Sequence, residues 1–151
     1  MITIIAVGKK HETWIEDGLE RYEKRLKRPF DVKWILLPHS SRSDLLARQE
    51  ESQRILSHLQ ERDYVVLLDE TGENVTSPTL SSLLESQFSN SRQLVFIIGG
   101  AYGVDERLLA RADFVWSLSK LVFPHQLVRL LVIEQIYRAQ SIAGGSSYHH
   151  I

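Results

Sequence analysis

Residues 94–103 read LVFIIGGAYG, in which five apolar residues run directly into a loop with glycine at three of its five positions. The apolar run is typical of a buried β-strand. Glycine carries no Cβ and adopts positive φ easily, so a ligand can lie against the backbone where such a strand ends. The same pattern also fits a tight turn that binds nothing. This stretch alone leaves both interpretations open.

Segments typical of strands and helices alternate along the rest of the chain. Runs rich in β-branched and aromatic residues predict further strands at 2–7, 32–37, 64–68 and 114–118. Helical spacing of apolar residues predicts helices at about 12–27, 45–59, 77–88, 105–110 and 125–143. Residues 71–78 predict a turn. The alternation predicts an α/β fold, with a largely parallel sheet of five to six strands flanked by helices and with ligands at the carboxyl ends of the strands.

Length and composition limit the classes of protein to consider. The 151 residues fit one domain, so we expect residues 1–151 to form a single domain. The absence of cysteine fits a reducing compartment and excludes thiolate nucleophiles and cysteine-ligated metal sites. No apolar run approaches the roughly 20 residues of a membrane helix, and the first ten residues lack the charge order of a secretory signal. We therefore expect a cytoplasmic protein without membrane contact.

The charge of the chain is nearly balanced, with a formal net charge of −1. Any contact with nucleic acid must therefore come from a local basic patch. The densest group is Lys24, Arg25, Lys27 and Arg28, at the end of the first predicted helix. These residues could contact phosphate, but basic residues in a last helical turn more commonly complement the helix dipole.

Three predicted strands bring polar or glycine-rich segments to one edge of the sheet. These are Asp69, residues 99–103 and residues 117–124. The glycine loop matches neither GxGxxG nor a P-loop. Asp105 and Glu106, in the first turn of the next helix, would repel a phosphate; they could also only cap that helix, which leaves the argument against phosphate intact. An acidic edge suits a ligand with hydroxyls, an amino group or a positive centre, and S-adenosylmethionine has all three.

The C-terminal part of the chain contains a second group of candidate residues. His125 and Arg129 lie one helical turn apart and could hold a carboxylate or phosphate, or form a solvated first turn. The helix at 125–143 is apolar on most sides, which favours a homodimer interface. The tail at 144–151 reads GGSSYHHI; such a terminus is disordered by default, but tyrosine and histidine could also stack on a base and exchange protons.

Several segments, in order and along the whole chain, resemble the RlmH family of SPOUT-class methyltransferases. They are IIAVGK, LDETG, IIGGAYG, WSLSKLVFPHQLVRLLVIEQIYRAQSI and a final YH. The resemblance implies a SPOUT-type α/β domain with a C-terminal trefoil knot, assembled as a homodimer. It also implies an rRNA (pseudouridine-N3-)-methyltransferase, which transfers a methyl group from S-adenosyl-L-methionine to N3 of a pseudouridine in 23S rRNA on the assembled ribosome. No metal is required.

The resemblance also implies which residues act. The donor site would comprise Leu68, Asp69, Gly99, Gly100, Ala101, Gly103, Leu118, Ser119, Lys120, Leu121, Val122 and Phe123. The RNA and the reacting base would meet Arg129, Tyr148 and His149, with His149 as the candidate general base, supplied by its own subunit or by its partner. The family tail commonly reads NHPYHR, whereas residues 145–150 here read GSSYHH.

Three other functions fit parts of the pattern. A related knotted methyltransferase could act on another RNA. A ribosome-binding module could keep the fold without catalysis. A nucleotide-phosphate binder is disfavoured by the acidic residues near the glycine loop.

Overall fold

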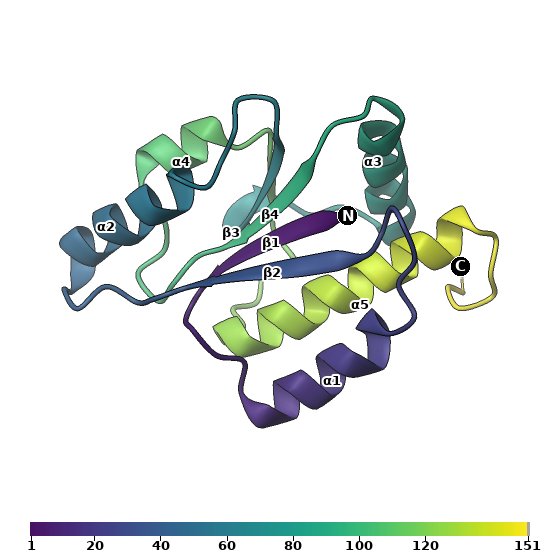
Figure 1. Cartoon of the computed structure of the whole chain (residues 1–151), viewed down its shortest axis with the longest axis horizontal. Helices are drawn as coiled ribbons and strands as arrows, with labels where there is room; N and C mark the ends of the chain where they lie inside the picture. The colour runs from purple at the N-terminus through teal and green to yellow at the C-terminus, as the bar shows by residue number, and fades with distance from the viewer. Residues whose placement is uncertain (151) are drawn as a thin grey trace.

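A five-stranded sheet forms the centre of the protein, whose computed structural model describes residues 1–150 (Figure 1). The strand order is β2-β1-β4-β3-β5, and every neighbouring pair is parallel. The predicted α/β fold with a largely parallel sheet is therefore confirmed. The strands are β1 (Ile2–Val7), β2 (Val32–Leu37), β3 (Tyr64–Glu73), β4 (Leu94–Ile98) and β5 (Phe114–Trp116).

Helices cover both faces of the sheet, because successive side chains of the central strands point to opposite sides. Ile4 and Phe96 pack against α1, α3 and α5, while Ile5 and Ile97 pack against α2 and α4 (Figure 1). Such strands, buried on both faces, read as continuous apolar runs, and this is why β1 and β4 were predictable. The helices are α1 (Thr13–Glu23), α2 (Asp44–Leu56), α3 (Ser77–Ser89), α4 (Glu106–Arg111) and α5 (His125–Ala143).

The structure corrects the predicted course of β3. The strand was expected to end at residue 68 and to be followed by a turn, but it continues to Glu73. Trp116 of β5 is paired with both Leu68 and Glu73, so residues 69–72 bulge out of the ladder. Gly72 passes so close to the backbone of β5 that a Cβ there would overlap Val115. The bulge arises from long-range pairing, which local sequence patterns do not encode.

The other differences concern the ends of elements. α1 stops at Glu23 instead of about residue 27, because the chain tightens into turn hydrogen bonds, from Arg25 N to Tyr22 O (2.9 Å) and from Leu26 N to Glu23 O (3.0 Å). β5 is shorter than predicted and ends at Trp116.

α5 is the longest helix, with 19 residues, and most of its apolar surface is used within the chain. Val132, Ile133 and Ile136 are buried against the sheet and its neighbouring helices. Leu127 and Leu131 remain half-buried and lie outside both core clusters. No helix within residues 1–150, α5 included, is long and apolar enough to cross a membrane.

Candidate functional site

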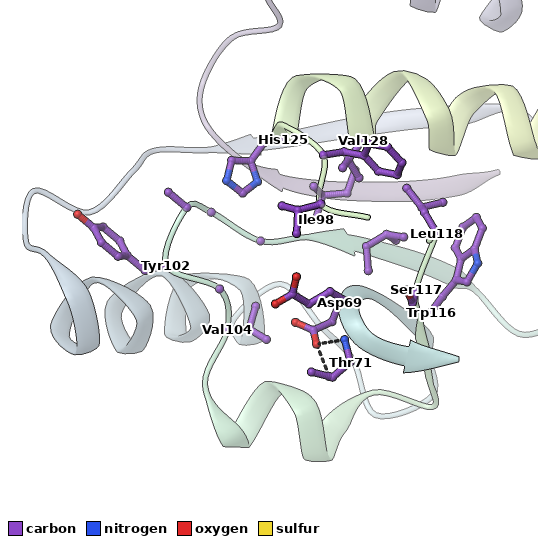
Figure 2. A pocket seen from close by; sticks show the side chains of 18 of the residues that line it. Asp69, Thr71, Ile98, Tyr102, Val104, Trp116, Ser117, Leu118, His125 and Val128 are labelled. Atoms are coloured by element: carbon purple, nitrogen blue, oxygen red, sulfur yellow. Dashed lines mark hydrogen bonds between the residues drawn. The ribbon is translucent and has the colours of Figure 1, made fainter. Parts of the chain in front are cut away.

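A cavity of about 550 Å³ opens beside the bulge of β3 and the ends of β4 and β5 (Figure 2). Its size is that of a small-molecule site, for which roughly 300–1,000 Å³ is usual. Three loops form its walls: the β3 bulge, the glycine loop after β4 and the segment after β5. All the residues predicted for the donor site line this cavity except Lys120, which is exposed.

Several residues that the sequence did not single out also line the cavity. Tyr102 lies within the glycine loop and Val104 directly follows it, so their positions in the chain could have indicated them. Trp116 and Val128 come from β5 and α5 and had no such signal. Figure 2 shows these side chains around the cavity, together with His125 at the start of α5.

The glycine loop differs in detail from the prediction. Only Gly103 of its three glycines has a positive φ, at 76°, and its N–H donates to Gly100 O (3.1 Å) to close a tight turn. Gly100 is required for another reason, since a Cβ there would lie 2.5 Å from Glu51 Oε1. At Gly99 a Cβ would lie 2.9 Å from Val104 Cγ1. At these two glycines the missing Cβ makes room for neighbouring side chains of the protein, while their backbone lines the cavity.

Glu51 is a buried carboxylate beneath the glycine loop, and only 3% of the residue is exposed. Its Oε2 accepts a hydrogen bond from Ser40 N (2.8 Å) and lies 4.0 Å from His39 Nδ1. Its Oε1 faces Gly100 without a hydrogen-bond partner among the described residues. No sequence pattern indicated this burial, because Glu51 lies in α2, a helix with mostly polar residues.

The wall after β5 is ordered by its own serines. Ser117 Oγ donates to Ser119 O (2.8 Å), and Ser119 Oγ accepts from Leu121 N (3.0 Å). Leu121 and Val122 beyond them are 70% and 79% exposed. Large apolar side chains so exposed at the edge of a cavity are typical of an interaction surface.

The acidic residues of the site require one correction. Asp69 lies in the β3 bulge, faces the cavity and accepts hydrogen bonds from Thr71 N (3.0 Å) and Thr71 Oγ1 (Figure 2). Asp105 instead caps α4 through Leu108 N (3.2 Å) and pairs with Arg107 (2.6 Å). Neither Asp105 nor Glu106 lines the cavity. These two acids therefore do not face the cavity, and the alternative that Asp105 caps its helix is confirmed, while the repulsion of a phosphate stays a prediction.

Arg129 lies in the interior, with 1% of the residue exposed. Its Nη2 donates to Val7 O (3.0 Å) and Gly8 O (3.1 Å), and its Nη1 donates to Lys10 O (3.0 Å) and His11 Nδ1 (3.1 Å). Gly8 has a φ of 119°, and a Cβ there would lie 2.9 Å from Nη2. The guanidinium thus ties the start of α5 to the loop after β1. Within this chain it has no surface with which to touch RNA.

Two histidines near this guanidinium are held neutral. Burial, and next the charge of Arg129, lower the pKa of His11. Burial, followed by Arg129 and His39, lowers the pKa of His125, and Glu51 opposes this only in part. Since a guanidinium only donates, His11 Nδ1 must accept, which requires the neutral ring. The expected pairing of His125 with Arg129 around an anion therefore has no free guanidinium to form it.

The tail folds back on α5. Tyr148 packs edge-on against Tyr137, with ring centroids 4.8 Å apart, and the Arg138 guanidinium lies 4.7 Å from the Tyr148 ring centre. Tyr148 Oη donates to Glu134 Oε2 (3.4 Å), and His149 Nδ1 lies 3.1 Å from Arg138 Nη1. Glu134 and Arg138, one helical turn apart, form an ion pair at 3.0 Å.

These contacts restrict the chemistry of the tail. Burial, the hydrogen-bonded neighbour Tyr22 and the nearby Glu134 carboxylate raise the pKa of Tyr148 to about 12, so the phenol keeps its proton at neutral pH. His149 Nδ1 must accept from the guanidinium of Arg138, which leaves the proton of the neutral ring on Nε2. In this conformation Tyr148 is a hydrogen-bond donor, and the lone pair of His149 is occupied.

The tail and the cavity lie at opposite ends of α5 (Figure 1). His125 lines the cavity, whereas Arg138 holds the tail, and the helical rise of about 1.5 Å per residue places them roughly 20 Å apart. The structure therefore brings the predicted donor-site residues together but leaves Tyr148 and His149 away from them in the same chain.

Comparison with known proteins identifies the family. A family model described as "Predicted SPOUT methyltransferase" matches residues 1–149. The chain belongs to the SPOUT methyltransferase family. The match covers both the cavity and the tail.

Individual relatives are similar over nearly their whole length. The ribosomal RNA large subunit methyltransferase H of Acetivibrio thermocellus is 41% identical, with 98% of each chain covered. Proteins of the same name from Caldicellulosiruptor saccharolyticus and Hydrogenovibrio crunogenus are each 37% identical; 99% of this chain is covered in the first case and 98% in the second.

Replacing Arg129 by methionine tests its role in holding the chain together. Arg129→Met leaves buried carbonyls of the loop after β1 without donors, so we expect the free energy of unfolding to fall by about 3–5 kcal/mol. Urea denaturation measures this change. Arg62→Met, at an exposed arginine, is the matched control and should change stability by no more than about 0.5 kcal/mol. Equal stability of the two variants would contradict the assigned role.

The lowered pKa of His11 predicts a pH dependence of stability. Its folded pKa lies below the unfolded value of about 6.5, so the unfolded chain gains a proton first as the pH falls. The contribution to stability is complete above about pH 6.5 and is lost below it. Urea midpoints at about pH 7.5 and 5.5 should therefore differ less in His11→Gln, whose amide oxygen still accepts from Arg129, than in the unaltered protein. The same pH dependence in both would refute the prediction.

Proposed function

We propose that this protein is an S-adenosyl-L-methionine-dependent methyltransferase that methylates N3 of a pseudouridine in 23S rRNA on the assembled ribosome. It acts in the cytoplasm, as a homodimer of single domains spanning residues 1–151, of which Ile151 lies outside the described residues. The observation that carries the proposal is the cavity between the glycine loop, the β3 bulge and residues 117–123 in a chain of this family. The trefoil knot belongs to the same proposal.

The cavity is suited to a methyl donor of this kind. Its apolar walls, including Ile98 and Leu118, match a ligand with a flat aromatic base, and the exposed backbone of the glycine loop offers hydrogen bonds. Asp69 adds a negative charge that favours a positive centre and hydroxyl or amino donors. When bound, S-adenosyl-L-methionine supplies a methyl group on a positively charged sulfur, so this chemistry requires no metal.

A second copy of the chain would complete the site. Leu121 and Val122 expose apolar surface at the mouth of the cavity, and Leu127 and Leu131 continue it along the outer face of α5. If two copies pack around a twofold axis, the apolar surface of each copy covers the same surface of the other. An antiparallel pairing of the two α5 helices sets the C-terminal end of each beside the start of the other. The tail of one subunit then reaches the cavity of its partner.

In this arrangement the tail residues act on the acceptor base. We assign to His149 the removal of the N3 proton, which requires it to leave Arg138 and free its lone pair. Tyr148 keeps its proton and donates a hydrogen bond to the base. Arg129, predicted at the RNA, is assigned a positioning role: it holds the loop after β1 and the start of α5, which carries His125 into the cavity wall.

Calorimetry and methyl transfer onto ribosomes together test the proposal. We expect S-adenosyl-L-methionine to bind and tritium to appear on one pseudouridine of ribosomes from a strain that lacks the activity. Gly103→Val strains a residue whose φ is 76°, and should weaken donor binding at least about tenfold. Gly145→Val is the matched control, since that tail glycine has a φ of 72° and equal open space, and it should leave donor affinity unchanged.

Other results would point elsewhere. Donor binding with label on a different RNA would contradict the assigned substrate. Absence of donor binding together with ribosome binding would indicate a module without catalysis, and tight ATP binding would indicate a nucleotide site.

Mixed dimers test whether the tail acts across the interface. Gly103→Val damages the cavity, and His149→Ala should slow single-turnover methylation roughly 10²–10⁴-fold. If the site combines one cavity with the partner's tail, refolding the two inactive variants together restores one intact site per mixed dimer, about a quarter of normal activity. If each tail serves its own cavity, every site in the mixture keeps one defect and activity stays low. That second outcome would contradict the shared site.

A further inference from the structure

The end of α1 and the loop that follows it form the densest basic segment of the chain. Residues 21–28, which we term the basic loop, contain Arg21, Lys24, Arg25, Lys27 and Arg28. All five side chains lie at exposed positions. Neutralising a helix dipole, equivalent to about half a charge, does not require five cations.

Almost none of this charge is compensated within residues 1–150. The first four basic side chains make no ion pair or hydrogen bond there, and Arg28, 88% exposed, has its nearest carboxylate at 3.9 Å, on Asp31. Most arginines elsewhere are engaged, for example Arg54 with Glu50 (2.5 Å) and Arg107 with Asp105 (2.6 Å), whereas the exposed Arg62 is a single cation without a partner among the described residues.

The one acidic residue within the basic loop is turned away from it. Glu23 Oε1 accepts from Trp34 Nε1 (2.5 Å), and burial raises the pKa of its carboxyl group. Glu23 therefore points towards β2 and forms no ion pair with a cation of the basic loop among the described residues.

The basic loop is fixed beside the tail. Gln140 of α5 accepts a hydrogen bond from Lys27 N (2.7 Å) and donates one to Arg25 O (3.0 Å). The Tyr22 ring lies 5.7 Å from Tyr137, which in turn contacts Tyr148 of the tail. The basic loop, with its cations, therefore lies at the same end of the molecule as the tail (Figure 1).

We propose that the basic loop is a docking surface for ribosomal RNA, and that its free cations contact backbone phosphates beside the target nucleotide. The inference rests on the proposed function and adds to it the surface that holds the substrate. Lysine and arginine without internal partners are the groups that neutralise phosphates and release counterions. A rigid attachment to α5 lets these cations orient the tail that carries Tyr148 and His149.

An anionic membrane is the other partner that such charge could attract, and the surface does not favour it. Membrane-bound basic segments expose large apolar side chains that enter the lipid. Here the apolar residues of the segment, Tyr22 and Leu26, pack inward against the core.

The test compares charge reversal in the basic loop with reversal elsewhere. Arg25→Glu and the double variant Lys24→Glu/Lys27→Glu should weaken binding to large ribosomal subunits, at least about tenfold for the double variant. The slope of log Kd against log salt should fall by about one for each phosphate that a variant no longer neutralises. Arg62→Glu, at an exposed arginine after α2, reverses one charge as Arg25→Glu does, but outside the basic loop, and should have a small effect on both quantities.

Donor calorimetry, methylation kinetics and vesicle binding separate the possible results. Calorimetry should give unchanged affinity for S-adenosyl-L-methionine in every variant, and methylation should show a raised KM for ribosomes with little change in kcat. Equal weakening by Arg62→Glu, or unchanged affinity and salt slope in the double variant, would overturn the proposal. The proposal would also be overturned if the protein bound phosphatidylglycerol vesicles through the basic loop but did not bind ribosomes. Failure of the unaltered protein to bind the donor would instead count against the proposed function.

Discussion

The hydrogen bonds of the Arg129 guanidinium are the constraint on which the carboxyl edge of the sheet depends. Removing a cation from water costs several kcal/mol, so a buried guanidinium needs partners for most of its donors; of the donors of Arg129 only Nε lacks one among the described residues. Here three backbone oxygens at the end of β1 and in the loop after it, and one imidazole nitrogen, accept from it. Since Arg129 belongs to the second turn of α5, these bonds also fix where that helix starts. The position of one cavity wall is fixed in the same way, because His125 and Val128, which line it, lie in the first turns of α5 together with Arg129.

The cavity itself is made by loops that leave the sheet in different ways. β4 ends in a turn closed between Gly100 and Gly103, β5 passes into a segment braced by Ser117 and Ser119, and β3 bulges before it rejoins the ladder. β3 and β4 beneath are buried on both faces, and the pairing of β3 with β4 and β5 holds the three loop origins side by side. The shape of the site therefore depends on the sheet, while its chemistry depends on a few polar groups such as Asp69.

The parts predictable from sequence were those set by local periodicity. The bounds of β1, β2, β4 and α5 were predicted correctly because continuous apolar runs and helical spacing do not depend on distant partners. The bulge in β3 was missed since it arises from pairing with Trp116, far along the chain. The burial of Arg129 was missed for the same reason: all its partners lie in residues 7–11. The resemblance to the family predicted which residues line the cavity, and the periodicity of apolar residues could not have done so.

The contact between Glu51 and Gly100 has a consequence for detecting such cavities in other chains. A strand followed by a glycine loop is a weak signature, shared by many turns that bind nothing. Here the second glycine is required by a carboxylate that approaches from α2, so these two positions constrain each other. A larger residue at position 100 would demand a shorter one at position 51. A search profile that requires both the glycine loop and an acidic residue at the position of Glu51 in α2 should therefore separate such cavities from simple turns better than the loop alone. In divergent chains, substitutions at these two positions should occur together.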